Sequence, residues 1–177
     1  MNRIWKFLLV ISALIIIDQL TKGYVQNNFA LGESVDVIKG FFNFTYVRNT
    51  GAAFGMGADY HDSIRKPLFL FLPVVACIWL VWLIWKVRHE SLMEGWAYSL
   101  ILSGAIGNLI DRFSLGYVVD FLDFYIGDNH FPAFNVADSA ISVAAGMLIL
   151  NFLIQLKDER NKAVVQAQNG DDASGTD

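Results

Sequence analysis

The chain has 177 residues, of which 55% are hydrophobic and only 17% are charged. Soluble domains carry about 25% charged residues, so the composition excludes an ordinary soluble protein and predicts an integral membrane protein with one compact domain. The net charge of −4 comes partly from the polar C-terminal segment and says little about partners, but no basic patch in the sequence suggests nucleic acid. The single cysteine, Cys77, cannot form an internal disulfide, and no metal-ligand spacing surrounds it.

Four apolar stretches predict four transmembrane helices, over residues of about 4–21, 67–86, 95–111 and 134–156. Arg3 and Lys6 precede the apolar core of the first stretch and no small-residue cleavage site follows it, which indicates an uncleaved helix with a cytoplasmic N-terminus. The third stretch is rich in small residues, which let helices approach closely in membranes. The fourth stretch carries one charge, Asp138, in its first turns.

The segments between and after these stretches predict smaller elements outside the membrane. Residues 35–37 and 42–46 alternate between apolar and polar, the pattern of a β-hairpin or small sheet. Residues 59–66 are polar and predict a short surface helix. We expect residues 1–162 to form a single membrane-embedded domain and the polar residues 163–177 to form a disordered cytoplasmic tail.

The predicted orientation gathers the polar residues at one face of the membrane. Cations flank the ends of the apolar stretches at residues 3–6, 86–88 and 157–162, so both termini are expected in the cytoplasm. The opposite, extracytoplasmic ends then hold a set of acidic and amide side chains together with one arginine: Asp18, Asn49, Asn108, Asp111, Arg112, Asp120 and Asp138. Charges at the edge of the hydrocarbon are costly, which favours a functional site in this layer.

Asp120 and Asp138 are the candidate reactive pair. Two carboxyl groups brought together at low dielectric cannot both ionise easily, so the pair can act as acid and base and cleave a peptide bond with water. A proton or ion pathway explains the same residues, and on physical grounds hydrolase and carrier are equally supported. A non-enzymatic assembly subunit, which needs only packing, is a third alternative.

Other polar residues favour structural roles. Asp18 lies four residues before Lys22, a spacing that predicts an ion pair on one helix face, and Asp111 beside Arg112 is also interpreted as structural. Asp123 follows Asp120 by three residues, and spacing leaves open which of the two faces the site. No histidine has a second ligand at helical spacing, so no metal is expected.

Five blocks, in this order, resemble the motifs of the lipoprotein signal peptidase (type II signal peptidase) family and cover residues 4 to about 157. The blocks are Asp18–Lys22, Asn49–Phe54, Gly107–Arg112, Val118–Phe121 and Phe134–Ser139. Any one block alone is a weak signal, whereas five in order are highly specific. The departures are small: Ser103 stands where a glycine is common, and Phe131 where a tryptophan is common.

The resemblance implies an all-α membrane protein with four transmembrane helices, a small extracytoplasmic β-sheet and a short periplasmic surface helix. It implies an aspartic endopeptidase of the bacterial inner membrane that cuts diacylglyceryl-modified prolipoproteins before the lipidated cysteine, near the periplasmic face. It implies a monomer among membrane lipids, without cofactor or metal, that cyclic peptides such as globomycin inhibit. Asp120 and Asp138 match the catalytic pair. The residues that match substrate-binding, inhibitor-binding or positioning residues are Asn49, Gly51, Asn108, Arg112, Asn135 and Asp18.

Overall fold

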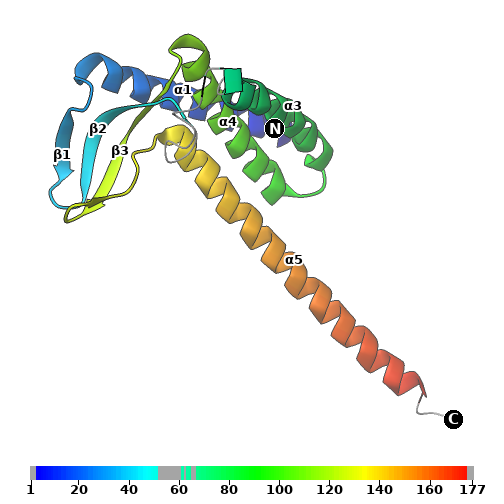
Figure 1. Cartoon of the computed structure of the whole chain (residues 1–177). Helices are drawn as coiled ribbons and strands as arrows, with labels where there is room; N and C mark the ends of the chain where they lie inside the picture. The colour runs from blue at the N-terminus through cyan, green and yellow to red at the C-terminus, as the bar shows by residue number, and fades with distance from the viewer. Residues whose placement is uncertain (1–2, 52–60, 62, 65–66, 175–177) are drawn as a thin grey trace.

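The computed structural model describes residues 3–51, 61, 63–64 and 67–174 and is mostly helical (Figure 1). Its helices are α1 (Arg3–Asn28), α3 (Leu72–Val87), α4 (Leu92–Ser114) and α5 (Val136–Ser174), and a π-helical segment, η2 (Pro67–Phe71), leads into α3. Its strands are β1 (Ser34–Ile38), β2 (Phe42–Asn49), β3 (Val118–Ile126) and β4 (Asn129–His130). The surface helix predicted over residues 59–66 falls largely outside the described residues, and so do residues 52–54 of the second motif.

Helix α4 is the centre of the helical part and packs against α1, α3 and α5. Its small residues allow this packing, as predicted. A Cβ atom on Gly104 would lie 2.4 Å from the backbone oxygen of Ala137 in α5, and one on Gly107 would lie 2.5 Å from Oδ2 of Asp18 in α1. Both distances are far below van der Waals contact, so only glycine permits the observed approach of the three helices.

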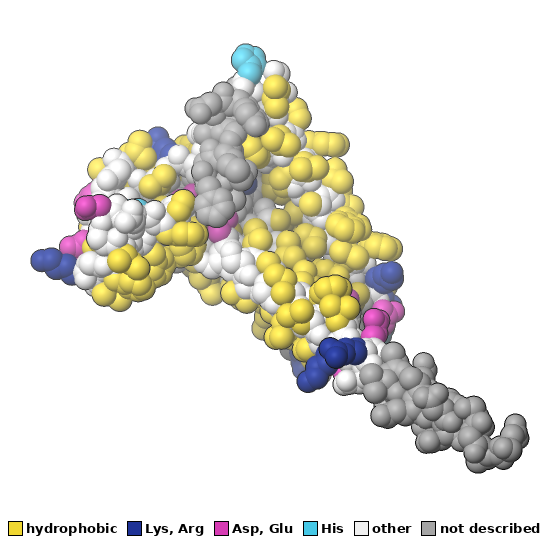
Figure 2. Space-filling model, turned by 60° about the horizontal axis from the view of Figure 1, so that its bottom comes forward, with side chains coloured by type: hydrophobic (Ala, Val, Ile, Leu, Met, Phe, Trp, Pro, Cys, Tyr) yellow, Lys and Arg dark blue, Asp and Glu magenta, His cyan; other side chains and the backbone are white. Residues whose placement is uncertain are grey.

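Three described helical segments are long and apolar enough to cross a membrane: Arg3–Asn28, Pro67–Val87 and Val136–Lys162. Figure 2 shows hydrophobic side chains covering the helical part of the molecule, with charged side chains gathered where α5 leaves it. Helix α4 is not among these three segments, because its sequence mixes apolar residues with small residues and with Glu94, Asn108, Asp111 and Arg112. Its 23 residues would still extend about 35 Å.

The sheet has four antiparallel strands in the order β1-β2-β3-β4. The predicted hairpin is confirmed as β1 and β2, with Val35 opposite Phe44. Strand β3 was not predicted, although its nine residues, VVDFLDFYI, are rich in the β-branched and aromatic residues that favour strands. The register shifts between Phe44 and Val47, so β2 contains an irregularity just before the residues that reach the site.

Two helices extend beyond their predicted ends. Helix α1 continues past residue 21 to Asn28 because Val25 packs with Tyr46, Val119 and Phe121 in a buried cluster that joins the helix to the sheet. Helix α5 continues through most of the expected tail to Ser174, and Figure 1 shows it projecting far from the other helices. Between residues 157 and 169 the sequence has neither glycine nor proline, which is compatible with a continuous helix.

Candidate active site

The fold brings Asp120 to the first turn of α5. Asp120 lies in β3 opposite Val47 and is 2% exposed. After β4 the chain returns along β3, where the backbone nitrogen of Leu122 donates to the oxygen of Phe134 at 2.8 Å and the nitrogen of Phe134 donates back at 3.1 Å. Asn135 follows immediately and α5 begins one residue later, so this pairing places the start of α5 beside Asp120.

Asn135 connects Asp120 and Asp138 through one fully buried side chain. Its Nδ2 donates to Oδ1 of Asp120 at 2.7 Å, and its Oδ1 accepts from the backbone nitrogen of Asp138 at 2.9 Å. In return, Oδ2 of Asp138 accepts from the backbone nitrogen of Asn135 at 3.2 Å. This reciprocal pattern is a capping box at the N-terminus of α5, and it fixes the rotamer of Asp138 relative to Asp120.

Two further asparagines complete the contacts of the acidic pair. Nδ2 of Asn49 donates to Oδ2 of Asp120 at 3.0 Å, and Nδ2 of Asn108 donates to Oδ1 of Asp138 at 2.8 Å. All four carboxyl oxygens therefore accept a hydrogen bond from an N–H donor. These donors come from β2, α4 and the start of α5, so the pair is held by three separate parts of the fold.

Arg112 and Gly51 bind each other at the edge of the same site. Nη2 of Arg112 donates to the oxygen of Gly51 at 2.9 Å, and the nitrogen of Gly51 donates to Oδ1 of Asn49 at 2.9 Å. The guanidinium group thus connects α4 to the segment after β2. It contributes positive charge beside the two aspartates while its hydrogen bond goes to the peptide backbone.

Both aspartates open into one cavity of about 580 Å³. The polar residues that line it are Asn49, Asn108, Arg112, Asp120, Asp138, Ser139 and Ser142, and the apolar ones are Val118, Phe131, Pro132, Ala133, Phe134, Ile141 and Val143. A cavity of this size, with apolar walls and a few convergent polar groups, is typical of a ligand site. Among the described residues, no group of three or more His, Cys, Asp or Glu side chains is arranged to hold a metal ion.

Of the two aspartates in β3, Asp120 faces the site and Asp123 faces away from it. Side chains three apart in a strand point to opposite faces. Asp123 accordingly points away from the cavity, where its carboxylate contacts Nδ1 of His130 at 2.8 Å and accepts from Oγ1 of Thr45 at 3.1 Å. Asp120 is therefore the β3 carboxyl group of the site.

The pKa of Asp120 lies far above its ordinary value. Burial is the main cause and the nearby Asp138 carboxylate adds to it, and together they raise the pKa of Asp120 to about 7. Hydrogen bonds from Asn49 and Asn135 and the charge of Lys22 act in the opposite direction. The two carboxyl groups can therefore share one proton near neutral pH, the state that acid–base cleavage of an amide requires.

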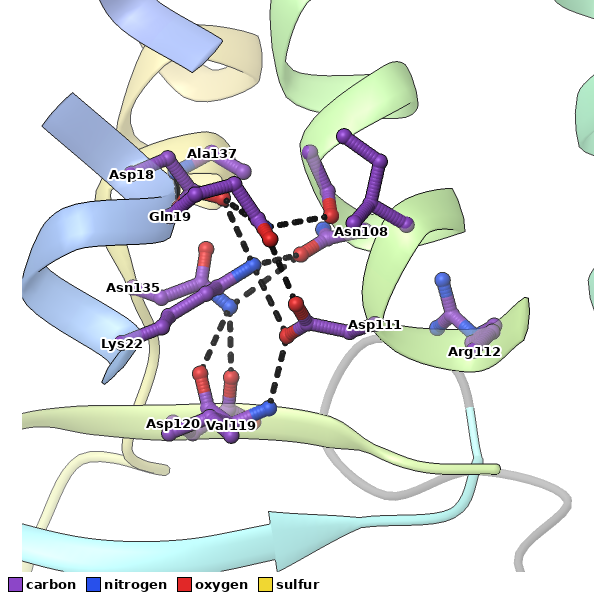
Figure 3. A network of polar contacts seen from close by, with 12 residues as sticks. Asp18, Gln19, Lys22, Asn108, Asp111, Arg112, Val119, Asp120, Asn135 and Ala137 are labelled. Carbon is purple, nitrogen blue, oxygen red and sulfur yellow. Dashed lines mark hydrogen bonds and ion pairs between the residues drawn. The ribbon is translucent and has the colours of Figure 1, made fainter. Parts of the chain in front are cut away.

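A second polar cluster lies behind the site, shown in Figure 3. The ammonium group of Lys22 contacts Oδ2 of Asp18 at 2.9 Å and Oδ2 of Asp111 at 3.1 Å, so the predicted Asp18–Lys22 ion pair is confirmed. Oδ1 of Asp18 accepts from the backbone nitrogen of Ala137 at 2.9 Å. Asp18 is not among the described residues that line the cavity, and its contacts are structural.

Gln19 and Lys22 also make contacts with α4 that were not predicted from the sequence. Gln19 donates to Oδ1 of Asp111 at 2.9 Å and to the oxygen of Gly107 at 3.1 Å, and Lys22 donates to Oδ1 of Asn108 at 2.8 Å. Both residues lie inside the first motif, but the contacts join positions 86 to 92 residues apart. Helical spacing revealed only the partner of Lys22 within its own helix.

Together, fold and site define a membrane protein with paired carboxyl groups of the kind that aspartic peptidases use. A family model described as signal peptidase (SPase) II matches residues 10–154. This match covers more than half of the chain, so the chain belongs to the lipoprotein signal peptidase (signal peptidase II) family, an aspartic peptidase family. Of the three functions that the sequence left open, family membership supports the peptidase and not the carrier or the assembly subunit.

Individual relatives agree with this assignment. The chain is 47% identical over 165 residues to the lipoprotein signal peptidase of Shewanella sediminis, covering 91% of this chain and 87% of the relative. It is 42% identical over 153 residues to that of Syntrophus aciditrophicus, covering 86% and 95%. A solved structure described as a bacterial membrane enzyme at 2.3 Å resolution matches with a TM-score of 0.78 and 36% identity, covering 90% of this chain and 92% of that one.

Proposed function

We propose that this lipoprotein signal peptidase cleaves diacylglyceryl-modified prolipoproteins directly before the lipidated cysteine, with Asp120 and Asp138 as the catalytic pair. The observation that carries the proposal is the contact of the buried Asn135 with both aspartates, through its Nδ2 on one side and its Oδ1 and backbone nitrogen on the other. Both carboxyl groups also line one cavity. Such an arrangement supports two acids acting as a unit.

The reaction begins with one proton on the pair. The ionised carboxylate takes a proton from a water molecule, which attacks the scissile carbonyl carbon, while the other carboxyl group donates its proton to the carbonyl oxygen. The aspartate that took a proton from water then donates it to the nitrogen of the lipidated cysteine, which leaves as an amine. As the tetrahedral intermediate collapses, one of its hydroxyl protons passes to the other aspartate, so the pair again holds one proton. The raised pKa of Asp120, caused by burial and by Asp138, supports the presence of the shared proton at neutral pH.

The cavity provides complementary groups for both parts of the substrate. Arg112 and Asn108 supply donors that can bind the peptide backbone or orient the carboxylates. The apolar walls at Phe131, Phe134 and Val143 provide contact surface for apolar side chains and for the acyl chains. Cyclic peptides such as globomycin would inhibit the enzyme by occupying this cavity.

The proposed placement is a multi-pass monomer in the bacterial inner membrane, with α4 as the fourth span and both termini in the cytoplasm. The sheet and the two aspartates would then lie near the periplasmic face. Supporting this, Lys86 and Arg88 lie at the end of α3, and Lys157, Arg160 and Lys162 lie along the distal part of α5, far from Asp138. The substrate would enter from the outer leaflet of that bilayer.

The test is cleavage of a synthetic precursor peptide by the full chain in proteoliposomes. The peptide is supplied with diacylglycerol on its cysteine and, as a matched control, without it. Mass spectrometry should find a product beginning at the lipidated cysteine, and globomycin should suppress it, while the unlipidated peptide stays intact. Equal cleavage of both peptides, or cleavage at another bond, would contradict the proposed specificity.

A further inference from the structure

We propose that Lys22 is a positioning residue for the peptidase reaction, acting on Asp138 through the side-chain amide of Asn108. This inference rests on the proposed function, because it presumes that Asp138 is one of the two reacting acids. It assigns the buried cluster behind the site a role beyond stability. Figure 3 shows the ammonium group of Lys22 directed at Asn108, between α1 and α4.

The ammonium group of Lys22 is enclosed by hydrogen-bond acceptors. Lys22 is 2% exposed, and its Nζ contacts Oδ2 of Asp18 at 2.9 Å, Oδ2 of Asp111 at 3.1 Å and Oδ1 of Asn108 at 2.8 Å. An ammonium group has three hydrogens and no acceptor. All three donors are therefore used by described partners, so Lys22 has no hydrogen bond left for the substrate, and any effect of its hydrogen bonds on the site must pass through one of these neighbours.

Lys22 determines which end of the Asn108 amide faces Asp138. An asparagine amide can turn by 180° and exchange its donor and acceptor ends. A lysine accepts no hydrogen bond, so it binds only the oxygen end. Oδ1 of Asn108 accepts from Nζ of Lys22 at 2.8 Å and, at the longer distance of 3.3 Å, from Nδ2 of Asn135, which is shared with Asp120. With this oxygen held mainly by Lys22, the Nδ2 group of Asn108 faces Asp138 and donates to its Oδ1 at 2.8 Å. Without the ammonium group the amide could turn its oxygen toward Asp138, where two acceptors would repel each other.

The positive charge of Lys22 also acts on the acidic pair. The positive charge of Lys22 opposes the effect of burial on the pKa of Asp120, the carboxyl group that burial and Asp138 raise to about 7. Loss of this charge would make the second ionisation of the acidic pair harder. The pH at which the pair loses its shared proton should therefore move upward, a change that lost stability alone does not produce.

The experiment compares Lys22→Met with Gln19→Met, both assayed with the lipidated peptide as full-length enzymes. Among the described residues, Gln19 donates to Asp111 and Gly107 within the same cluster and does not contact the amide of Asn108, so its loss weakens the cluster and leaves that amide oriented. After normalisation to the folded fraction, Lys22→Met should lose kcat by about 10²-fold with KM little changed. Its loss of activity at alkaline pH should occur at higher pH. Gln19→Met should keep the wild-type kcat and pH profile.

A double-mutant cycle tests whether Lys22 acts through Asn108. In an Asn108→Ala background, adding Lys22→Met should cause no further loss of kcat, because the amide is already missing. If Lys22→Met does not fold, Lys22→Met/Asp111→Asn replaces it in both comparisons, since it removes the cation together with one of its carboxylates. The folded fraction is measured by thermal unfolding in detergent.

Three results would overturn the inference: a normalised kcat for Lys22→Met like that of Gln19→Met, an unchanged pH profile, or independent losses for Lys22 and Asn108. Asp138→Asn, assayed beside them, separates this failure from a failure of the proposed function. Full activity of Asp138→Asn would reject the catalytic pair itself. An inactive Asp138→Asn with a normal Lys22→Met would reject only the role of Lys22.

Discussion

Replacing Gly104 by alanine should separate the two helices that hold the active site. A Cβ atom there would lie 2.4 Å from the backbone oxygen of Ala137 and 2.7 Å from a side-chain carbon of Ile141, both in α5. The oxygen belongs to the backbone of α5, so the clash cannot be relieved by a rotamer change. Ordinary contact begins at about 3.4 Å, so the start of α5 must retreat from α4 by about 1 Å.

This displacement has an expected magnitude for stability and for activity. Overpacking of this kind costs about 1–3 kcal/mol, only partly offset by the gain of about 0.5–1 kcal/mol when alanine replaces a helical glycine. Asn108 is in α4 and Asp138 is in α5, so their 2.8 Å hydrogen bond would be stretched. A 1 Å error in a reacting group can cost about 10² in rate, and we expect a loss of that order in kcat.

The assay measures thermal unfolding and cleavage of the lipidated peptide side by side, with Gly146→Ala as the control. Gly146 is also in α5, but no described atom beyond its own helix and chain neighbours lies within 4 Å of a Cβ there. The same chemical change should therefore be neutral or slightly stabilising at Gly146 and should leave kcat intact. Equal behaviour of the two variants would refute the packing argument.

Three further predictions concern the acidic pair and its surroundings. Asn135→Ser keeps an oxygen that can cap α5 but loses the amide donor to Asp120. The kcat should therefore fall by about 10²-fold or more with little loss of thermal stability. Retained activity would contradict the role of Asn135 as a bridge between the two aspartates. Asp123→Asn should keep activity within a few-fold, because Asp123 faces His130 and Thr45, and its inactivation would contradict the assignment of Asp120. Burial and the second carboxylate raise the pKa of Asp120 to about 7, so the folded state binds the proton of this group more tightly than the unfolded state does. The contribution of Asp120 to the free energy of unfolding is therefore greatest below pH 4 and is lost as the pH rises through 7. Unfolding of Asp120→Asn should lack this dependence between pH 4 and 8, and a wild-type slope in that variant would contradict it.

The sequence was sufficient to propose Asp120 and Asp138 as the acidic pair, because both lie in short motifs next to apolar stretches. Asp120 and Asp138 stood out as costly charges near predicted helix ends, and the structure brings both into one cavity. The Asp18–Lys22 pair followed from helical spacing and is present at 2.9 Å. These features depend on local periodicity, which a single sequence reveals.

The features that were not predicted depend on contacts between distant segments. Strand β3 was treated as a connection because its partners in β2, from Phe42 to Asn49, lie 69 to 82 residues earlier in the chain. The extension of α1 to Asn28 comes from packing of Val25 against that same sheet. The contact of Lys22 with Asn108 joins residues 86 positions apart, and no local pattern indicates it.

The choice between Asp120 and Asp123 shows the same limit at the scale of one strand. Alternation assigns the two residues to opposite faces, but only the position of α5 decides which face is the site. That position follows from the bridge between Leu122 and Phe134, which places Asn135 next to Asp120. The tertiary contact, and not the spacing, selects Asp120 as the residue that faces the cavity.

The most direct measurement is single-turnover cleavage of the lipidated peptide by Asp120→Asn and Asp138→Asn in proteoliposomes. Each substitution preserves the size of the side chain but removes the carboxyl group that would share a proton. We expect both variants to insert, to bind the peptide and to cleave none of it over a period in which the wild type completes its turnover. Cleavage at the wild-type rate by either variant would show that the reaction does not use these two acids together.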